Sequence, residues 1–395
     1  MTHDPVTEMD TARRQAVAAA ADAFGVDLYR RLAADGQNLV FSPASIAAAL
    51  QLALIGARGS TAGQLAAALH LDGPSEPDPA AAAGDGLRLL SGVIQSADGA
   101  ETTLRAPSTL WVQAGLPLEP SFLAQIQDVA AAVVQETDFR GAPEQARSAI
   151  NELIAGQTAG KITNLLGRDA ITAATRLVLA NAVYLKARWA FPFTASATRD
   201  APFHPDEGAA PITVPMMHRT ASLPYRRGHG YQAVLLPYQG LPLAMAIVLP
   251  DGPLTALAGR LGDGGGGLSP VLGGADRQSV ALALPKFRQR TSAALIPVLR
   301  QLGVRDAFTD AADFTGITTA ERLLINAVVH QAYIDVDEQG TEAAAATAIG
   351  MRPMALRRGP EPIPFTVDRP FLFAITDTAT GLPLFLGQVT RPATS

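Results

Sequence analysis

The chain has 395 residues, with 31 lysine and arginine residues against 36 aspartate and glutamate residues, which gives a net charge of −5. Hydrophobic residues make up 48% and charged residues 17%, so the chain can bury a large core and most of it is excluded from disorder. A mildly acidic chain without a run of basic residues disfavours nucleic acid as a partner. No apolar run approaches the ~18 residues of a membrane span, so we expect no membrane association.

The chain has no cysteine, which excludes disulfides, cysteine nucleophiles and thiolate metal sites. The histidines, at positions 3, 70, 204, 218, 229 and 330, have no metal-ligand spacing. We find no motif for a cofactor or a nucleophile elbow, so we expect neither metal nor cofactor. The first ten residues lack the basic and apolar regions of a signal peptide. This predicts a cytoplasmic protein, or an extracellular one if a leader was removed.

The first part of the chain predicts helices. Apolar residues at three- and four-residue steps predict a helix over about residues 10–33. Ser42 can cap a second helix, Pro43 suits its first turn, and the almost wholly apolar run that follows ends at Gly56. Thr61 and Gln64 have the spacing of a capping box and predict a third helix start.

Later segments alternate between helical and strand patterns, and strands dominate after Phe203. Residues 72–86 read as a loop, and the four glycines at 264–267 as a flexible surface loop. The predicted helices are 121–131 and 143–158; the predicted strands are 108–113, 176–186, 212–217, 231–237, 243–250 and a hairpin at 371–389. Helices first and strands later indicate an α+β fold.

The segment from Leu323 to Glu338 alternates as a strand does. His330 shares a face with Val328, Ala332, Ile334 and Val336, while Gln331, Tyr333, Asp335 and Asp337 take the other face. A histidine among apolar neighbours is more often a buried, hydrogen-bonded residue than a catalytic base. We therefore expect His330 in the core.

Residues 338–364 allow two readings. One is a short alanine-rich helix followed by a proline-rich loop. The other is a strand after a turn at Gln339 and Gly340. In that strand Thr341, Ala343, Ala345 and Thr347 would face one way and Glu342 and Arg352 the other. Such small residues could enter a closed sheet. The prolines at 353, 360, 362 and 364 favour the extended backbone that a protease cleft accepts.

These residues lead to a family, because the sequence resembles the serpins along essentially its whole length. The resemblance lies in Asn38–Ile46, Leu179–Trp189, Val329–Ala348, Asp368–Phe373 and Leu384–Gly387. It implies a single domain, residues 1–395, with an α+β serpin fold. In that fold helices pack on a large mixed central β-sheet and two smaller sheets, and a reactive-centre loop, here about residues 339–364, is exposed.

The resemblance also implies a function, which is that of a metastable, monomeric protease inhibitor rather than an enzyme. A serine protease would cleave the loop and form a covalent acyl complex. The freed hinge would then insert into the central sheet and distort the protease before the ester is hydrolysed. An insertion of fourteen residues from Gly340 to Met354 would carry the bound protease ~46 Å.

Carried over by position, the resemblance assigns three groups of residues that control this motion. The hinge comprises Gly340, Thr341, Glu342, Ala343, Ala344, Ala345, Ala346 and Thr347, with Thr341 the first residue to insert. The shutter, beneath the strands that part, comprises Ser42, Pro43, Ser45, Asn181 and His330. The breach, where insertion begins, comprises Trp189, Lys286 and Glu338, with an ion pair expected between Lys286 and Glu338.

Counting from Gly340 places the reactive bond at Met354–Ala355. Methionine suits chymotrypsin-, elastase- or subtilisin-like proteases with apolar pockets. Because the loop is long beyond Met354, a shifted register is open. Leu356 would keep this specificity, while Arg352, Arg357 or Arg358 would select a trypsin-like enzyme. A non-inhibitory serpin that binds a ligand or partner, and a hydrolase assembled from unassigned Ser, His and Asp residues, are the alternatives.

Overall fold

The computed structural model describes residues 9–73, 78–97, 102–127, 132–205, 209–261, 267–342 and 361–393. The helices in these ranges are α1 (Thr11–Leu32), α2 (Pro43–Gly56), α3 (Gly59–Ala68), α4 (Pro79–Ser96), α5 (Pro120–Gln127), α6 (Pro143–Gln157), α7 (Leu254–Arg260), α8 (Ser269–Leu272) and α9 (Ile296–Gln301), with 3₁₀ turns η1 (Ala195–Ala197) and η2 (Asp306–Phe308). The strands are β1 (Leu39–Phe41), β2 (Thr103–Arg105), β3 (Ser108–Gln113), β4 (Ala132–Thr137), β5 (Leu177–Arg188), β6 (Arg199–Phe203), β7 (Ile212–Gly228), β8 (Tyr231–Pro237), β9 (Leu243–Pro250), β10 (Asp276–Pro285), β11 (Phe287–Ala294), β12 (Ile325–Val336), β13 (Gly340–Thr341), β14 (Ile363–Thr366), β15 (Phe371–Asp377) and β16 (Pro383–Val389).

The first sheet is seven-stranded, with the order β11-β12-β13-β5-β3-β4 and with β2 paired to β5. Its central feature is the parallel pairing of β12 with β5, which runs from Ile325 and Leu177 to Tyr333 and Tyr184. Beyond that last pair the two strands part, and the short strand β13 lies between them. The sheet is therefore closed along most of its length and open at one end.

The second sheet is nine-stranded, with the order β1-β16-β15-β9-β8-β7-β10-β14 and with β6 paired to β7. The two smaller sheets that the resemblance implied are joined here through β7. In β7, residues Met216–Tyr225 pair with β10, and residues Tyr225–Gly228 pair with β8. The strands from the buried hairpin of β15 and β16 to β14 thus form one continuous sheet.

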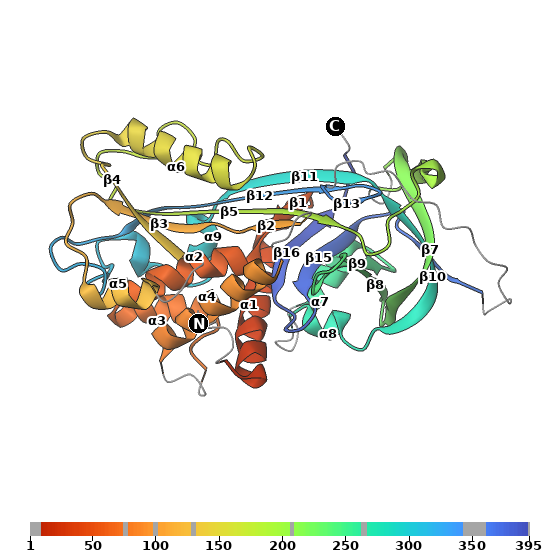
Figure 1. The fold of residues 1–395 in the computed structure, drawn as a ribbon, viewed down its shortest axis with the longest axis horizontal. Helices are drawn as coiled ribbons and strands as arrows, with labels where there is room; N and C mark the ends of the chain where they lie inside the picture. Colours follow the sequence, from red (N-terminus) through yellow and green to blue (C-terminus); the bar gives the residue numbers. More distant parts are fainter. Residues whose placement is uncertain are drawn as a thin grey trace.

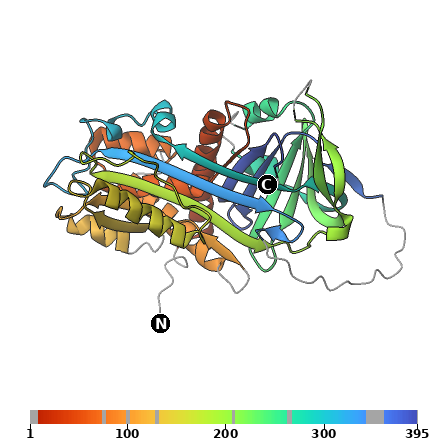
Figure 2. The ribbon, with the colours of Figure 1, turned by 90° about the horizontal axis from the view of Figure 1, so that it is seen from above.

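Helices cover both faces of the seven-stranded sheet. Figure 1 shows α6 on one side and α1, α2 and α4 on the other, and Figure 2 shows α6 lying over the face of the sheet, alongside its long strands. Alternate residues of β5 serve the two sides: Leu179 and Val183 join the main core, whereas Val178 and Ala180 join the cluster under α6. A new strand in this sheet must therefore present side chains to two packed layers.

The sequence predicted the position of α2 well. Ser42 caps its N-terminus by accepting a hydrogen bond from the Ser45 N–H at 3.1 Å, and Pro43 occupies the first turn. Every residue of α2 is buried, as expected for a helix that is apolar on all sides. The helices at 10–33 and 143–158, the strands named above and the final hairpin are also confirmed, except that the strand expected at 212–217 continues to Gly228.

Other local predictions were wrong. The third helix begins at Gly59, and Thr61, instead of capping it, accepts a hydrogen bond from the Asp313 N–H at 3.0 Å. The loop expected through Gly86 contains the first turns of α4, which Asp78 caps.

Short-range patterns do not show which partner a segment meets, and β1, β2, β4, β6, β10 and β11 were not predicted. The described part of α5, up to Gln127, agrees with the helix expected over 121–131. Strand β14 starts at Ile363, inside the expected end of the loop. Residues 262–266, which include three of the four glycines at 264–267, lie outside the described residues.

Two properties bear on the kind of site to seek. None of the helices within the described ranges is both long and apolar enough to cross a bilayer. The same part of the chain contains no group of three or more His, Cys, Asp or Glu side chains placed to hold a metal ion.

Candidate functional site

The open end of the seven-stranded sheet holds the start of the predicted hinge. In β13, Gly340 pairs with Arg188 and Thr341 with Ala187 of β5, while Thr341 also pairs with Val336 of β12. Two residues of the hinge thus already occupy the position of a central strand.

Gly340 is required here by close backbone contact. A Cβ atom at this position would lie 2.0 Å from the Ala187 carbonyl oxygen and 2.8 Å from the Arg188 Cα, so no other residue fits without movement. The turn before it is held by Asp337, whose carboxylate accepts hydrogen bonds from the N–H groups of Gln339 at 2.8 Å and Gly340 at 3.1 Å. Burial raises the pKa of this Asp337 carboxyl.

Thr341 is fully buried and faces the main core. Its hydroxyl lies 2.6 Å from the hydroxyl of Tyr238, and burial raises the pKa of Tyr238, so this phenol stays neutral. The Tyr238 ring stacks on Trp189, with the ring centroids 4.7 Å apart. The indole N–H of Trp189 donates to the Asp337 carbonyl at 3.0 Å. One aromatic stack therefore supports both the turn and the first inserted residue.

The expected ion pair between Lys286 and Glu338 is present, with Nζ 2.9 Å from Oε2. The other oxygen of Glu338 accepts from the Thr198 hydroxyl at 2.7 Å. Burial raises the pKa of Glu338, but the hydrogen bonds from Lys286 and Thr198 outweigh this effect and leave the pKa below its usual value. These residues line a cavity of about 380 Å³ next to the hinge. The breach is thus a charged, partly hydrated end of the sheet.

The shutter lies farther along the same two strands, where His330 of β12 pairs with Asn181 of β5. His330 is completely buried, which lowers the pKa of its imidazole to about 3. Its Nε2 accepts the Ser42 N–H at 3.1 Å, so its Nδ1 carries the proton and donates to the Asn181 side-chain oxygen. A neutral histidine therefore ties β12 both to β5 and to the start of α2.

A second set of hydrogen bonds extends the shutter to β3. The Asn181 amide donates to the Ser45 backbone oxygen and hydroxyl and to the Ser108 hydroxyl. Ser108 in turn donates to the Ser45 carbonyl at 3.2 Å. The network is buried and connects three strands to one helix, so parting β5 from β12 requires breaking it.

The structure thus brings together the residues predicted for the shutter and those predicted for the breach, although their roles remain predictions. Sequence reasoning missed Tyr238, Thr198, Asp337 and Ser108. An aspartate two residues before a turn at Gln339–Gly340 was a usable signal for Asp337. The other three carry no local pattern, because their partners lie far away in the sequence.

Part of the predicted site lies outside the described residues. These are Ala343, Ala344, Ala345, Ala346 and Thr347 of the hinge, the bond Met354–Ala355, and the alternatives Arg352, Leu356, Arg357 and Arg358. The rival reading of the alanine run as a helix lies there too. The described chain leaves the sheet at Glu342 and resumes at Glu361, next to β14.

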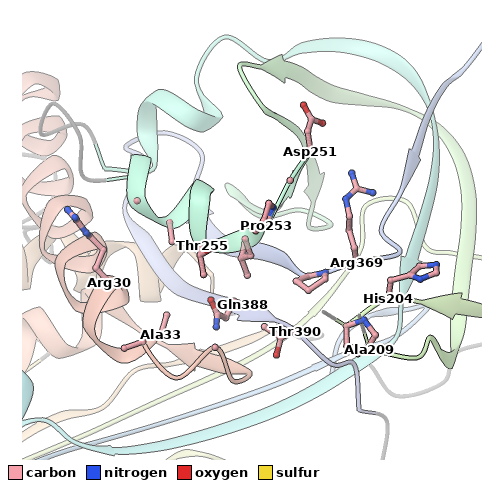
Figure 3. Close-up of a pocket in the computed structure, with 18 residues that line it drawn as sticks. Arg30, Ala33, His204, Ala209, Asp251, Pro253, Thr255, Arg369, Gln388 and Thr390 are labelled. Carbon is pink, nitrogen blue, oxygen red and sulfur yellow. The ribbon is translucent and has the colours of Figure 1, made fainter. Parts of the chain in front are cut away.

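A larger cavity, of about 940 Å³, lies elsewhere in the molecule. It is bounded by the end of α1 with Arg30, by α7 with its preceding loop, and by Arg369 and Pro370 before β15 (Figure 3). Its lining includes apolar side chains such as Leu254 and no residue of the hinge, shutter or breach. This volume falls in the range of small-molecule sites.

Comparison with known proteins agrees with this geometry. The sequence model of the family "Serpin (serine protease inhibitor)" matches residues 19–392. The chain is 39% identical to an uncharacterized serpin-like protein of Thermococcus kodakarensis, over 98% of this chain and 89% of that protein. It is 35% identical to the leukocyte elastase inhibitor of Bos taurus, over 95% of this chain and 99% of that protein.

Among solved structures, human thyroxine-binding globulin complexed with its hormone superposes with a TM-score of 0.84 at 26% identity, over 96% of this chain and 100% of that chain. A family match over nearly the whole chain, together with the two mixed sheets and the helices packed on them, defines the class of protein. The chain belongs to the serpin family and has the serpin fold.

Proposed function

We propose that this protein is an irreversible suicide-substrate inhibitor of serine proteases that acts by cleavage and insertion of its reactive loop. The relatives include an inhibitor of leukocyte elastase, which supports a protease target. The observation that carries the proposal is β13: Gly340 and Thr341 already pair with both β5 and β12. Strand insertion therefore has a formed starting point.

In this mechanism the protease serine attacks the carbonyl carbon of Met354. The protease histidine takes the serine proton and passes it to the amine of Ala355 as the peptide bond breaks. Met354 is left as an acyl ester of the serine. The hinge then enters the sheet behind Thr341, the bound protease moves with it, and distortion of its oxyanion hole stops hydrolysis of the ester.

The side chains of the hinge suit this route. In the sheet, Thr341 faces the core. If the strand continued, Ala343, Ala345 and Thr347 would follow on that face, and all three are small. The seven-stranded sheet is packed on both faces, and a bulky or charged side chain on the core face would oppose insertion. An inhibitor is therefore favoured over a member that only binds ligands.

The experiment is incubation with chymotrypsin, pancreatic elastase, subtilisin and trypsin, followed by denaturing electrophoresis and mass spectrometry. We expect a boiling-stable adduct of summed mass with an apolar-specific enzyme, and a released peptide Ala355–Ser395. A peptide beginning after Arg352, Leu356, Arg357 or Arg358 would move the reactive bond but keep the mechanism. Turnover of the loop by every enzyme without any adduct would contradict inhibition.

A ligand-binding role is the second candidate, and the cavity in Figure 3 favours it. A structural neighbour is a hormone-binding protein, so the fold accommodates such a role. This candidate predicts loop cleavage without an adduct and without a gain in thermal stability. The protease incubations therefore decide between the two.

A further inference from the structure

Glu342 marks the point at which the described chain leaves the seven-stranded sheet. Its N–H still donates to the Asp335 carbonyl of β12 at 2.7 Å. Its φ angle is +50°, in the left-handed region that a glutamate rarely adopts. This backbone kink needs support from neighbouring contacts, because an unsupported residue relaxes to φ < 0.

The side chain of Glu342 faces α6 and is only 15% exposed. One oxygen forms an ion pair with the Lys161 ammonium group. The other, Oε2, is buried and has no hydrogen-bond partner among the described residues. Arg288, another cation of this sheet, is bound to Asp335, with Nη2 2.7 Å from the carboxylate. Lys161 is thus the cation in direct contact with the buried Glu342 carboxylate.

Lys161 is presented by a rigid turn after α6. Its N–H donates to the Thr158 carbonyl at 2.9 Å, and the next residue, Ile162, donates to the Thr158 hydroxyl at 3.3 Å. Ile162 is fully buried in the cluster under α6. The ammonium group lies 5.4 Å from the ring centroid of Tyr333, which adds a cation–π contact. The position of Lys161 is therefore set by contacts other than Glu342.

This contact lies at the point where the sheet closes. Tyr333 pairs with Tyr184, and this is the last direct pair between β12 and β5 before β13 separates them. Tyr184 lies near Glu342, and its pKa is raised to about 12 by burial and by the Glu342 charge. Lys161 thus reaches from the turn after α6 to the point where β12 and β5 separate.

We propose that Lys161 is a positioning residue for loop insertion: it holds the Glu342 carboxylate on the outer face of the sheet and so keeps Thr341 inserted between β5 and β12. Without the ammonium group, Glu342 would be a buried and unbalanced charge. Moving it into solvent would draw Thr341 out of the sheet. The consequence for inhibition rests on the proposed function, because insertion would then have to start again after cleavage.

The test uses the absence of native cysteine, since Thr341→Cys introduces the only thiol of the chain. Its reaction rate with a thiol reagent reports whether position 341 is buried. We expect slow labelling with Lys161, labelling at least about tenfold faster with Lys161→Met, and a near-parental rate with Lys161→Arg. Labelling of the Lys161→Met variant within about twofold of the parent would overturn the proposal.

A second variant separates the ion pair from damage to the turn. Adding Glu342→Gln to Lys161→Met removes the unbalanced charge, so labelling should slow again towards the parental rate. Continued fast labelling in this double variant would show that Lys161 acts through the turn, which would also overturn the proposal.

The effect on inhibition is measured separately, without Thr341→Cys. The moles of inhibitor consumed per mole of protease inactivated should be higher for Lys161→Met than for the wild type. For Lys161→Arg this ratio should be close to the wild-type value. If no protease forms an adduct with the wild-type protein, the proposed function fails, and the labelling rates still decide the role of Lys161.

Discussion

The hydroxyl of Tyr238 lies 2.6 Å from the hydroxyl of Thr341, although 103 positions separate the two residues in the chain. Tyr238 follows β8 of the nine-stranded sheet, whereas Thr341 is the innermost described residue of the hinge in the seven-stranded sheet. The predicted hinge is therefore bonded to both sheets. In the proposed mechanism, this bond would set how far the hinge is inserted before the loop is cut.

Tyr238→Phe should release the hinge partially. The substitution keeps the ring that stacks on Trp189 but leaves the buried Thr341 hydroxyl without this partner, at a loss of about 1 kcal/mol in the free energy of unfolding. Urea unfolding followed by Trp fluorescence measures it. Tyr225→Phe, which removes a half-buried hydroxyl bonded to Gln232, is the control. A smaller loss in Tyr238→Phe than in the control would contradict this role.

Under the proposed function, Thr341→Arg should turn inhibition into simple cleavage of the loop. The arginine would have to occupy the fully buried site of Thr341 between β5 and β12, and burying an unpaired charge there costs several kcal/mol, so the hinge would be kept out of the sheet. Hydrolysis of the acyl ester would then precede insertion. Electrophoresis after incubation with protease should show the cleaved chain in place of the adduct. Thr341→Ser, which keeps the hydroxyl, is the control and should retain the adduct.

An unchanged adduct yield in Thr341→Arg would show that inhibition does not depend on the buried place of Thr341 between β5 and β12.

His330 should make stability depend on pH. Burial lowers the pKa of His330 to about 3, against an ordinary value near 6.5. Between these values the unfolded chain binds a proton that the native state excludes, so stability falls as pH falls, by about 1.4 kcal/mol per pH unit below pH 6. Above about pH 7.5 this contribution hardly changes with pH.

Comparison with His330→Gln isolates this effect from that of the carboxylates. Between pH 7.5 and 5.0 the wild type should lose about 2 kcal/mol more unfolding free energy than the variant, as measured by denaturant titration. His204→Gln alters an exposed ring and serves as the control. Parallel pH profiles for the wild type and His330→Gln would refute the neutral, buried state.

Glu338→Gln should weaken the breach. It removes the charge that pairs with Lys286 at 2.9 Å, while the amide can still accept from Thr198. Both side chains are partly exposed, at 32% for Lys286 and 13% for Glu338, so we expect a loss of about 1–2 kcal/mol, between the values for surface and buried pairs.

The same substitution should flatten the pH dependence of stability. The pKa of Glu338 is lowered in the folded protein, so its contribution is present above its unfolded pKa and is lost as pH falls through the folded value. Glu144→Gln, at the exposed pair with Arg147, is the control. Equal losses for the two variants at pH 7 would contradict a special role of the breach.

The sequence predicted elements whose signal is local. Ser42 followed by Pro43 located α2, and the alternation around His330 located β12 and the face on which the histidine lies. Period and capping act within a few residues, so they can be read from the chain directly. The resemblance to the serpins then placed Lys286 opposite Glu338, which no local pattern does.

The remaining features depend on partners distant in the sequence. Tyr238 contacts Thr341 only because the two sheets meet beside the hinge, and Lys161 contacts Glu342 only because the turn after α6 lies against the seven-stranded sheet. Thr61 had the spacing of a cap, but Asp313 recruits its hydroxyl instead. Tertiary contacts determine the partners of these residues, and local sequence spacing carries no information about those partners.

The central claim is that the intact fold holds a loop whose insertion stabilises it. The most direct measurement is thermal unfolding before and after a single cut within residues 343–360, with the protease removed. We predict a clearly higher unfolding temperature for the cut wild-type protein and little or no gain for cut Thr341→Arg. Equal unfolding temperatures for intact and cut wild type would contradict the account.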